Sequence, residues 1–357
     1  MTEFYQVKIA EVYKETKDTV VIAFDIPVHL QKSFYFIQGQ YLTIKITIDG
    51  EEIRRSYSLC SSPLDNEWKV AVKQISGGLF STYANTKLKT GDCIDLMKPA
   101  GNFHVDLSIK TPKNYIAFAA GSGITPMMSI IKTHLLSEPD STFKLFYLNR
   151  TVKSIIFKEE IEYLKNQFFG RFQVFYFLTQ EQRDIPFLNG RFDTDKLKVL
   201  TTTFIDIEDT NDCFICGPQE MIFLIRDHLI AEGLDRNNIH YELFYSGTLK
   251  NTKNHIIEVL DKKVEGTDIT IIDGGKEFHF IMNEDFDTIL DAALANGIDL
   301  PFACKGGVCS TCKCKVIDGS VEMKINYALD ESEIKQQLVL SCQAVPITDK
   351  VVVDFDV

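Results

Sequence analysis

The sequence predicts a chain of three unlike domains: an antiparallel β-barrel, an α/β domain with a parallel sheet, and a small α+β domain at the C-terminal end. Short runs of alternating apolar and polar residues, separated by Gly and Pro, indicate the barrel. Alternation of apolar strands with helical patterns from Asn114 onward indicates the parallel sheet. The polar stretch at 246–254 reads as a linker. At 357 residues the chain is too long for one ordinary core, and we expect domains at 1–110, 111–245 and 255–357.

Each domain has recognisable elements. Barrel strands are expected at 20–24, 41–46 and 68–73. In the second domain, strands are expected near 114–120, 143–148, 172–178, 213–216 and 240–244, with a helix opened by Pro126 and another around 221–225. After the linker we expect two strands and a helix over Phe286 to Ala295, which Asn296-Gly297 ends.

Charge is unevenly distributed along the chain. Residues 255–357 contain 19 Asp and Glu against 9 Lys and Arg, a net charge of −10, and the remaining residues account for only −2 of the total −12. Such acidity disfavours nucleic acid, whose phosphates it would repel, and favours a transient partner with a basic patch. A solvated acidic surface that only aids solubility is the alternative. For docking, the candidates are Asp285, Asp287, Asp291, Asp330, Glu331 and Glu333.

The chain shows no sign of membrane insertion or export. It contains no run of about 18 uncharged apolar residues, and the N-terminal residues lack a basic region followed by an apolar one. Nine cysteines, an odd number, without an export signal imply reduced thiols. We therefore expect a cytoplasmic protein without stable membrane insertion.

Four cysteines near the C-terminus have the spacing C-x4-C-x2-C followed by a distant fourth cysteine: Cys304, Cys309, Cys312 and Cys342. This spacing is typical of the ligand set of plant-type 2Fe-2S ferredoxins, and Gly306 and Gly307 would let the backbone bend closely around a cluster. A structural zinc site is the alternative, but zinc ribbons usually use two C-x2-C pairs and only one exists here. We expect these four thiolates to hold a 2Fe-2S cluster, so that the chain carries electrons.

The first domain contains three motifs. The segment Arg54–Leu59 contains R-x-Y-S, and Gly77-Gly78-Leu79-Phe80-Ser81 and Pro99-Ala100-Gly101 follow it. Together these motifs resemble those of a flavin-binding reductase family. Because alternate residues of a strand share a face, Arg55 and Tyr57 would point the same way, the cation toward a pyrophosphate and the phenol against a flavin ring. The turn at Gly78 before a helical pattern over 79–85 would offer backbone N–H groups to a diphosphate. A barrel strand that merely exposes Arg and Tyr is the alternative for R-x-Y-S by itself.

With these motifs the first 245 residues resemble the ferredoxin-NADP reductase family. The resemblance implies an FAD cofactor and places Ser58 near flavin N5. It also identifies Tyr241-Glu242-Leu243-Phe244 as the closing strand near the flavin. The candidate flavin-binding residues are Arg55, Tyr57, Ser58, Lys73, Gly78, Phe80 and Ser81.

A nicotinamide site is indicated in the second domain. Residues 116–128 form a buried strand, a glycine turn and a helix, with the pattern G-x-G-x-x-P at Gly121, Gly123 and Pro126. The third glycine of the Rossmann motif is absent, yet the pattern still presents a helix N-terminus to a pyrophosphate. Cys216-Gly217-Pro218 ends the strand at 213–216 and resembles the family's C-G-P motif beside the nicotinamide; a small buried thiol is the alternative for Cys216.

Coenzyme choice depends on the residues after the strand at 143–148. An acidic side chain there would bind the ribose of NAD, and a basic side chain would bind the 2′-phosphate of NADP. Asn149-Arg150 stands there, followed by Lys153 and Ser154, so we expect NADPH to be preferred. Alternatively, Arg150 caps a helix or pairs with Glu159 or Glu160. The candidate coenzyme-binding residues are Gly121, Gly123, Thr125, Pro126, Asn149, Arg150, Cys216, Gly217 and Pro218, and the catalytic candidates are Ser58, Cys216 and Glu242.

The whole chain resembles the single-chain reductase components of phenylacetyl-CoA epoxidases and of related bacterial oxygenases and desaturases. This resemblance implies a β-grasp ferredoxin domain and transfer of electrons from NADPH through FAD and the cluster to a partner oxygenase or desaturase. A flavin or quinone reductase that uses its cluster internally is one alternative, and a redox sensor without turnover is another. Cys60, Cys93, Cys213 and Cys314 are interpreted as packing residues.

Overall fold

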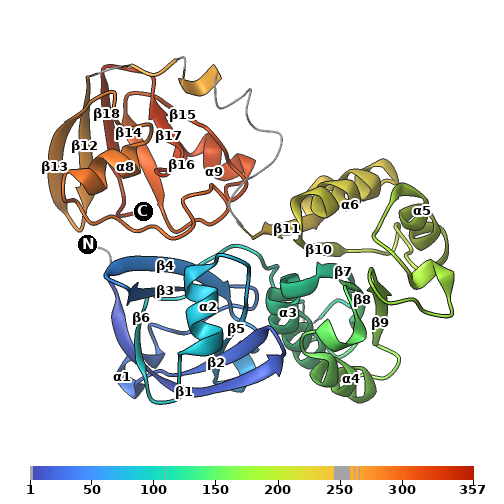
Figure 1. Ribbon diagram of the computed structural model, residues 1–357. Helices are drawn as coiled ribbons and strands as arrows, with labels where there is room; N and C mark the ends of the chain where they lie inside the picture. The colour runs from blue at the N-terminus through green and yellow to red at the C-terminus, as the bar shows by residue number, and fades with distance from the viewer. Residues whose placement is uncertain (1–2, 109, 245–257, 261, 265) are drawn as a thin grey trace. The chain divides into compact units, whose positions relative to one another are not determined.

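The computed structural model describes residues 3–108, 110–244, 258–260, 262–264 and 266–357 (Figure 1). The chain divides into two compact units. One comprises Tyr5–Ile53 and Tyr57–Phe244, and the other comprises Met1–Phe4, Arg54–Ser56 and Tyr245–Val357. The linker expected at 246–254 lies outside the described residues. The expected domain limits at 110 and 245 stay predictions.

The first sheet is a six-stranded barrel in the order β4-β3-β6-β1-β2-β5. Its strands are β1 (Tyr5–Thr16), β2 (Thr19–Asp25), β3 (Tyr41–Ile48), β4 (Glu51–Ser58), β5 (Trp68–Lys73) and β6 (Cys93–Leu96). An antiparallel bridge between Leu59 and Val70 joins the end of β4 to β5. Helix α2 (Leu79–Thr86) buries Phe80 and Ala84 against the barrel core, and a single turn, α1 (Val28–Gln31), precedes β3. The three strands expected from sequence lie within β2, β3 and β5.

The second sheet is parallel, in the order β11-β10-β7-β8-β9. Its strands are β7 (Asn114–Ala120), β8 (Thr142–Asn149), β9 (Phe172–Leu178), β10 (Asp212–Gly217) and β11 (Ile239–Leu243). Helices α3 (Ile124–Ser137) and α4 (Lys158–Gln167) cover one face, and α5 (Thr194–Thr203) and α6 (Gln219–Ala231) cover the other (Figure 1). The apolar runs of β7 and β8 are buried because helices cover both faces. The predicted α/β domain is confirmed.

One detail of this domain differs from expectation. Helix α3 begins at Ile124, directly after a 3-10 turn over Gly121–Gly123, so Pro126 is its third residue and not its first. Proline is still tolerated there, because the first N–H groups of a helix have no partner within the helix.

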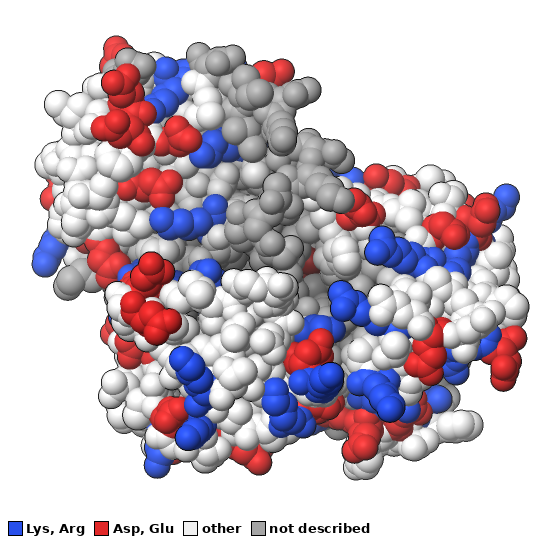
Figure 2. All heavy atoms as spheres, in the orientation of Figure 1, with Lys and Arg blue, Asp and Glu red and all other residues white. Residues whose placement is uncertain are grey.

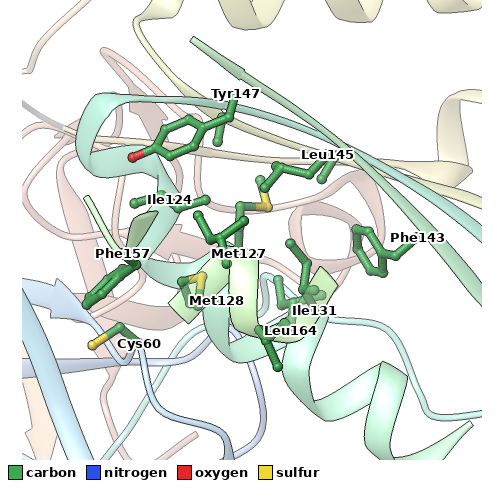
Figure 3. Close-up of a cluster of buried hydrophobic side chains, with 14 of the residues drawn as sticks. Cys60, Ile124, Met127, Met128, Ile131, Phe143, Leu145, Tyr147, Phe157 and Leu164 are labelled. Atoms are coloured by element: carbon green, nitrogen blue, oxygen red, sulfur yellow. The ribbon is translucent and has the colours of Figure 1, made fainter. Parts of the chain in front are cut away.

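A single hydrophobic core joins the barrel to the α/β domain. Val21, Cys60 and Ala71 of the barrel pack in the same buried cluster as Met128 of α3 and Phe157, the residue before α4. Figure 3 shows Cys60 below Phe157 and beside Met128. Burial of shared apolar surface holds the two domains together as one unit.

The C-terminal unit has a five-stranded mixed sheet in the order β13-β12-β18-β14-β16, with β12 and β18 parallel. The strands of the unit are β12 (Thr267–Asp273), β13 (Lys276–Met282), β14 (Lys313–Asp318), β15 (Val321–Met323), β16 (Leu338–Leu340), β17 (Ala344–Pro346) and β18 (Lys350–Asp354). Helix α8 (Ile289–Ala295) packs Leu290 and Ala293 into the core, and α9 (Glu331–Lys335) precedes β16. This is the expected β-grasp arrangement.

Helix α8 starts three residues later than its sequence predicted. The side chain of Thr288 accepts a hydrogen bond from the backbone N–H of Asp291, so Thr288 is the N-cap and Phe286 lies outside the helix. In the described ranges no helix is both long and apolar enough to cross a membrane.

Several acidic side chains of the C-terminal unit are paired with lysines. Asp287 lies 3.8 Å from Lys324, Asp291 lies 2.9 Å from Lys305, and Glu333 lies 2.9 Å from Lys313. Figure 2 shows basic side chains among the acidic ones on this unit. Half of the six acidic docking candidates are thus partly neutralised by a neighbouring cation.

Candidate functional site

Four thiols meet at the loop that precedes β14. The Sγ atoms of Cys304 and Cys309 are 3.1 Å apart, and the backbone N–H of Gly306 donates to Cys304 Sγ at 3.2 Å. Cys312 and Cys342 hydrogen-bond to each other, and electrostatic interactions link Cys309 with Cys312 and Cys304 with Cys342. The structure therefore brings together the four cysteines that the spacing selected.

In each of the two hydrogen-bonded pairs one cysteine is favoured as a thiolate, Cys304 and Cys342, whereas the pKa values of their donors, Cys309 and Cys312, are raised well above the usual thiol value. Hydrogen bonds from the Cys309 thiol and from backbone N–H groups lower the pKa of Cys304 to about 6. The pKa of Cys342 is lowered by a hydrogen bond from Cys312. Thiolate is the form that binds iron, so the residues present fit a cluster. Within the described residues no group of three or more His, Cys, Asp or Glu side chains is arranged to hold a metal ion, so the side-chain geometry by itself does not distinguish a cluster from zinc.

Gly307 shows why the cysteine loop needs glycine. Its φ is +71°, and a Cβ there would lie 2.8 Å from the carbonyl oxygen of Ile325. The Gly307 carbonyl accepts a hydrogen bond from the N–H of Tyr327 at 2.9 Å. The segment 325–327 therefore packs directly behind the loop and leaves no room for a side chain.

The proposed flavin residues lie on β4 and at the start of α2, except Lys73, which ends β5. Tyr57 is half-buried, and its ring lies 5.3 Å from the ring of the buried Phe80. Arg55, two residues earlier on β4, is exposed. Gly78 is the N-cap of α2, and Ser81 Oγ accepts a hydrogen bond from the Ile75 N–H at 3.2 Å, which fixes the turn before the helix. The first N–H groups of α2 can receive a diphosphate.

The three catalytic candidates, which are far apart in sequence, lie together. Ser58 Oγ donates a hydrogen bond to Glu242 Oε2 at 3.0 Å. Cys216 on β10 is the register partner of Glu242 on β11. Ser58 is at the end of β4, so the group lies where the barrel meets the carboxyl ends of the parallel strands, the usual place for ligands in such sheets.

Burial changes the proton affinity of this group. It raises the pKa of Glu242 to about 7, although the hydrogen bond from Ser58 acts in the opposite direction. It also raises the pKa of the Cys216 thiol well above its usual value, with the Glu242 charge as a second cause. Glu242 can therefore hold or release a proton near neutral pH, whereas Cys216 stays a neutral thiol.

The glycine turn packs against the end of β10. A Cβ on Gly123 would collide with the carbonyl oxygen of Cys216, and one on Gly217 would lie 3.0 Å from Ala120 Cβ. Thr125 Oγ1 donates to the Ser122 carbonyl at 3.0 Å, which ties the first turn of α3 to the glycine turn. Pro126 follows within α3, and Pro218 is the N-cap of α6. Two helices thus start beside Cys216.

The end of β8 carries a buried amide with few partners. Neither side-chain amide atom of Asn149 makes a hydrogen bond of good geometry within the described part of the chain, although the residue is 4 % exposed, and its one polar interaction is with the Tyr147 hydroxyl. That hydroxyl donates to the Gly121 carbonyl at 2.9 Å, with the Ile156 carbonyl as a second, longer acceptor at 3.4 Å. A polar ligand at this strand end would satisfy Asn149, so the residues fit the coenzyme.

Arg150, the next residue, is exposed, and no ion pair of its side chain with Glu159 or Glu160 is found among the described residues. The alternative that Arg150 only pairs with α4 therefore has no support, and its role toward a 2′-phosphate stays a prediction.

Comparison with known proteins identifies the same three domains. An oxidoreductase FAD-binding domain matches residues 6–105, an oxidoreductase NAD-binding domain matches 118–227, and a 2Fe-2S iron-sulfur cluster binding domain matches 271–346. The chain is 42% identical over 356 residues to one of the subunits of 1,2-phenylacetyl-CoA epoxidase from Escherichia coli K12, covering 100% of this chain and 99% of the relative. It belongs to the ferredoxin reductase family that combines FAD, a nicotinamide coenzyme and a 2Fe-2S cluster.

Two further comparisons give lower identity over nearly the whole chain. The ferredoxin reductase component of 3-ketosteroid-9-alpha-monooxygenase from Rhodococcus rhodochrous is 32% identical, with 97% of this chain and 95% of the relative covered. Among solved structures, phthalate dioxygenase reductase matches with a TM-score of 0.60 at 22% identity and covers 99% of this chain and 98% of its own. That likeness shows the fold.

The family membership confirms the expected FAD, NAD(P)H and 2Fe-2S cofactors. When bound, these groups let a reductase accept a hydride from the coenzyme and release its two electrons one at a time. Within the described residues, Ser58 and Glu242 hold a proton beside Cys216, and the N-termini of α2 and α3 are available for phosphates. The turn at Gly123 keeps its backbone close to Cys216.

Two residues lie beside the glycine turn. Tyr147 was not among the candidates from sequence, whereas Lys73 was among the flavin-binding candidates. Tyr147 lies in an apolar strand run, and nothing in that run marks its hydroxyl as the donor to Gly121. Lys73 was selected, and its Nζ lies 3.9 Å from where a Gly121 Cβ would stand and 3.8 Å from Asp18 Oδ2. A barrel lysine therefore lies beside the glycine turn.

The remaining thiols are mostly buried. Cys60, Cys213 and Cys314 are buried, and burial raises their pKa well above the usual thiol value, which agrees with their interpretation as packing residues. Cys93 on β6 is exposed, so its interpretation as a packing residue is wrong.

Proposed function

We propose that this reductase is the electron-transfer component of a phenylacetyl-CoA epoxidase-type oxygenase and that it takes its electrons from NADPH. The relationship to the epoxidase component of E. coli carries the proposal, because it extends over the full length of both chains at 42% identity.

The preference for NADPH rests on Arg150, an exposed guanidinium at the end of β8, one residue after the buried amide of Asn149. A guanidinium can hold a 2′-phosphate through two parallel hydrogen bonds. The sequence from 149 to 154 contains no acidic residue that could bind the ribose of NAD instead.

We propose the following roles for the site residues, which their positions and the family membership support. Ser58 and Glu242 serve proton transfer at the flavin, and Cys216 borders the nicotinamide. Arg55, Tyr57, Lys73, Gly78, Phe80 and Ser81 hold FAD, Cys304, Cys309, Cys312 and Cys342 hold the cluster, and the residues of the glycine turn and of 216–218 hold the coenzyme. We place the protein in the cytoplasm, where NADPH and CoA esters are available.

The deciding experiment is reconstitution with a terminal oxygenase. Purified holoprotein, NADPH and the oxygenase subunits of a phenylacetyl-CoA epoxidase should consume phenylacetyl-CoA and NADPH in equal amounts. The same reductase with the oxygenase of a 3-ketosteroid monooxygenase is the matched comparison. Turnover with the second oxygenase alone would contradict the proposal.

A second candidate, a reductase for a different monooxygenase, is favoured by the 32% identity to the 3-ketosteroid monooxygenase reductase. Stopped-flow mixing with NADPH separates both from the remaining alternatives. A redox sensor should be reduced slowly or incompletely, and a quinone reductase should turn over without any protein partner.

A further inference from the structure

A hydrogen bond between the barrel and the nicotinamide domain lies at the turn before α4. Glu15 Oε1, on barrel strand β1, accepts the backbone N–H of Phe157 at 2.7 Å. Phe157 is the N-cap of α4 in the left-handed conformation, with φ 60° and ψ 28°. Residues other than Gly, Asn and Asp rarely adopt this backbone conformation unless the surrounding structure imposes it.

Two contacts hold Phe157 in this conformation. Its ring is 4 % exposed and packs in the core with Cys60 and Met128, as Figure 3 shows. Its N–H points to a carboxylate, and hydrogen bonds to charged acceptors are stronger than neutral ones. Glu15 therefore stabilises a backbone turn that the chain would not otherwise favour.

The side chain of Tyr147 connects the turn at Phe157 to the glycine turn of the coenzyme site by hydrogen bonds. The single hydrogen of the Tyr147 hydroxyl is shared between two carbonyls: that of Gly121, the nearer acceptor at 2.9 Å, and that of Ile156, the residue before Phe157, at 3.4 Å. Tyr147 is fully buried. Its hydroxyl thus lies between the turn before α4 and the glycine turn, and displacement of one turn alters its bond to the other.

We propose that Glu15 is a positioning residue for the coenzyme: it fixes the turn at 156–157 from the barrel side and, through the Tyr147 hydroxyl, the glycine turn at 121–123. The barrel holds the flavin and the glycine turn holds the nicotinamide coenzyme, so this chain of contacts sets how the two are aligned. It does not depend on which oxygenase receives the electrons.

Two further polar contacts join the barrel to the α/β domain. Lys132 of α3 lies 2.8 Å from Asp65 of the barrel, and Ser62 Oγ lies 2.8 Å from Thr133 Oγ1. These contacts join the barrel to α3 itself. Glu15 adds the contact from the barrel to the turn before α4.

The test uses FAD-loaded holoprotein and two readouts, the Kd for NADP⁺ by calorimetry and amide hydrogen exchange. Glu15→Ala should weaken NADP⁺ binding about three- to tenfold. It should also speed exchange at 121–125 and at 155–157. Glu15→Gln keeps an acceptor oxygen and should stay within about twofold of the original protein. Glu11→Ala, which removes an exposed carboxylate from the same strand, is the matched control and should change neither readout.

Tyr147→Phe removes only the hydroxyl and keeps the ring in the core, so it carries the test if Glu15→Ala does not fold. It should weaken NADP⁺ binding to a similar degree, and the double variant should be no weaker than the weaker single one, because both act through the same contacts. Unchanged exchange at 121–125 in Tyr147→Phe, or additive effects in the double variant, would overturn the proposal. Equal losses in Glu15→Gln and Glu15→Ala would also overturn it, because the acceptor oxygen would then not matter.

Discussion

The cysteine loop and the flavin–nicotinamide site are assembled in different ways. Three of the four cluster thiols lie within nine residues of one loop, and the fourth follows β16 in the same small unit. The catalytic candidates Ser58, Cys216 and Glu242 come from three strands and lie up to 184 residues apart in the chain. The first site depends on local bending, and the second depends on how two domains pack.

This difference predicts how the two sites fail. Removing a cluster ligand should affect the small unit and leave hydride transfer intact. Small changes where the barrel packs on the parallel sheet should alter coenzyme use without touching the cluster.

The largest expected effect is that of Cys309→Ser. Loss of one of four thiolates should abolish cluster absorbance and reduce electron delivery to cytochrome c by more than about tenfold, because hydride transfer precedes the cluster. NADPH-dependent ferricyanide reduction should remain within about twofold. Cys314→Ala, which removes a buried thiol two residues from Cys312, is the matched control and should keep the cluster. If both activities disappear together in Cys309→Ser, the two sites are not independent.

Arg150→Ala tests the coenzyme end of the assembled site. A charge-assisted bidentate contact contributes about 1.5 to 3 kcal/mol, so the KM for NADPH should rise about ten- to a hundredfold. The KM for NADH should change little. Lys165→Ala, which removes a partly exposed cation near the C-terminal end of α4, should alter neither. Equal effects on the two coenzymes would show that Arg150 does not contact the 2′-phosphate.

Sequence predicts the local cysteine loop better than the site that is assembled from distant strands. The C-x4-C-x2-C spacing identifies the cluster ligands because they are local, and the strand at 172–178 is predicted with its observed limits. The contact between Ser58 and Glu242 could be expected only from the family resemblance, because no local pattern encodes a meeting of β4 with β11. The hydrogen bond from Phe157 to Glu15 could not be predicted from sequence. It depends on a left-handed backbone conformation at Phe157, which phenylalanine rarely adopts.

Glu242→Gln tests the proton at the assembled site. The pKa of Glu242 is raised to about 7 from 4.5, so between these values the folded chain binds the proton that the unfolded chain has lost. The stability contributed by this proton is complete below pH 4.5 and is lost as pH rises through 7. At pH 8 the Gln variant, which cannot ionise, should therefore have a Tm about 2 to 4 °C higher than the original protein. The difference should vanish near pH 5.

The flavin reduction rate offers a second measurement on the same variant. Stopped-flow traces of the original protein should show a pH dependence centred near 7, and Glu242→Gln should lack it. Ser58→Ala, which removes the hydrogen bond but no titrating group, should keep a pH dependence and shift its midpoint upward, since the Ser58 bond lowers the pKa of Glu242. A profile that survives in Glu242→Gln would assign the titration to another group.

The smallest effect concerns the acidic surface of the cluster unit. Because Asp287, Asp291 and Glu333 each lie beside a lysine, raising the salt concentration from low to several hundred millimolar should slow electron delivery to the oxygenase by only about two- to fivefold. Charge reversal at Asp285 and Glu331 should have a similar effect without changing cluster content. Insensitivity to both would leave apolar contacts around the cluster loop as the basis of docking.

An exposed thiol outside the cluster set gives the protein a natural attachment point. Cys60, Cys213, Cys216 and Cys314 are buried and hold their protons, whereas Cys93 is exposed on β6. A maleimide added to the cluster-loaded protein would therefore modify the barrel at one position. A spin label there would report its separation from the iron atoms during turnover.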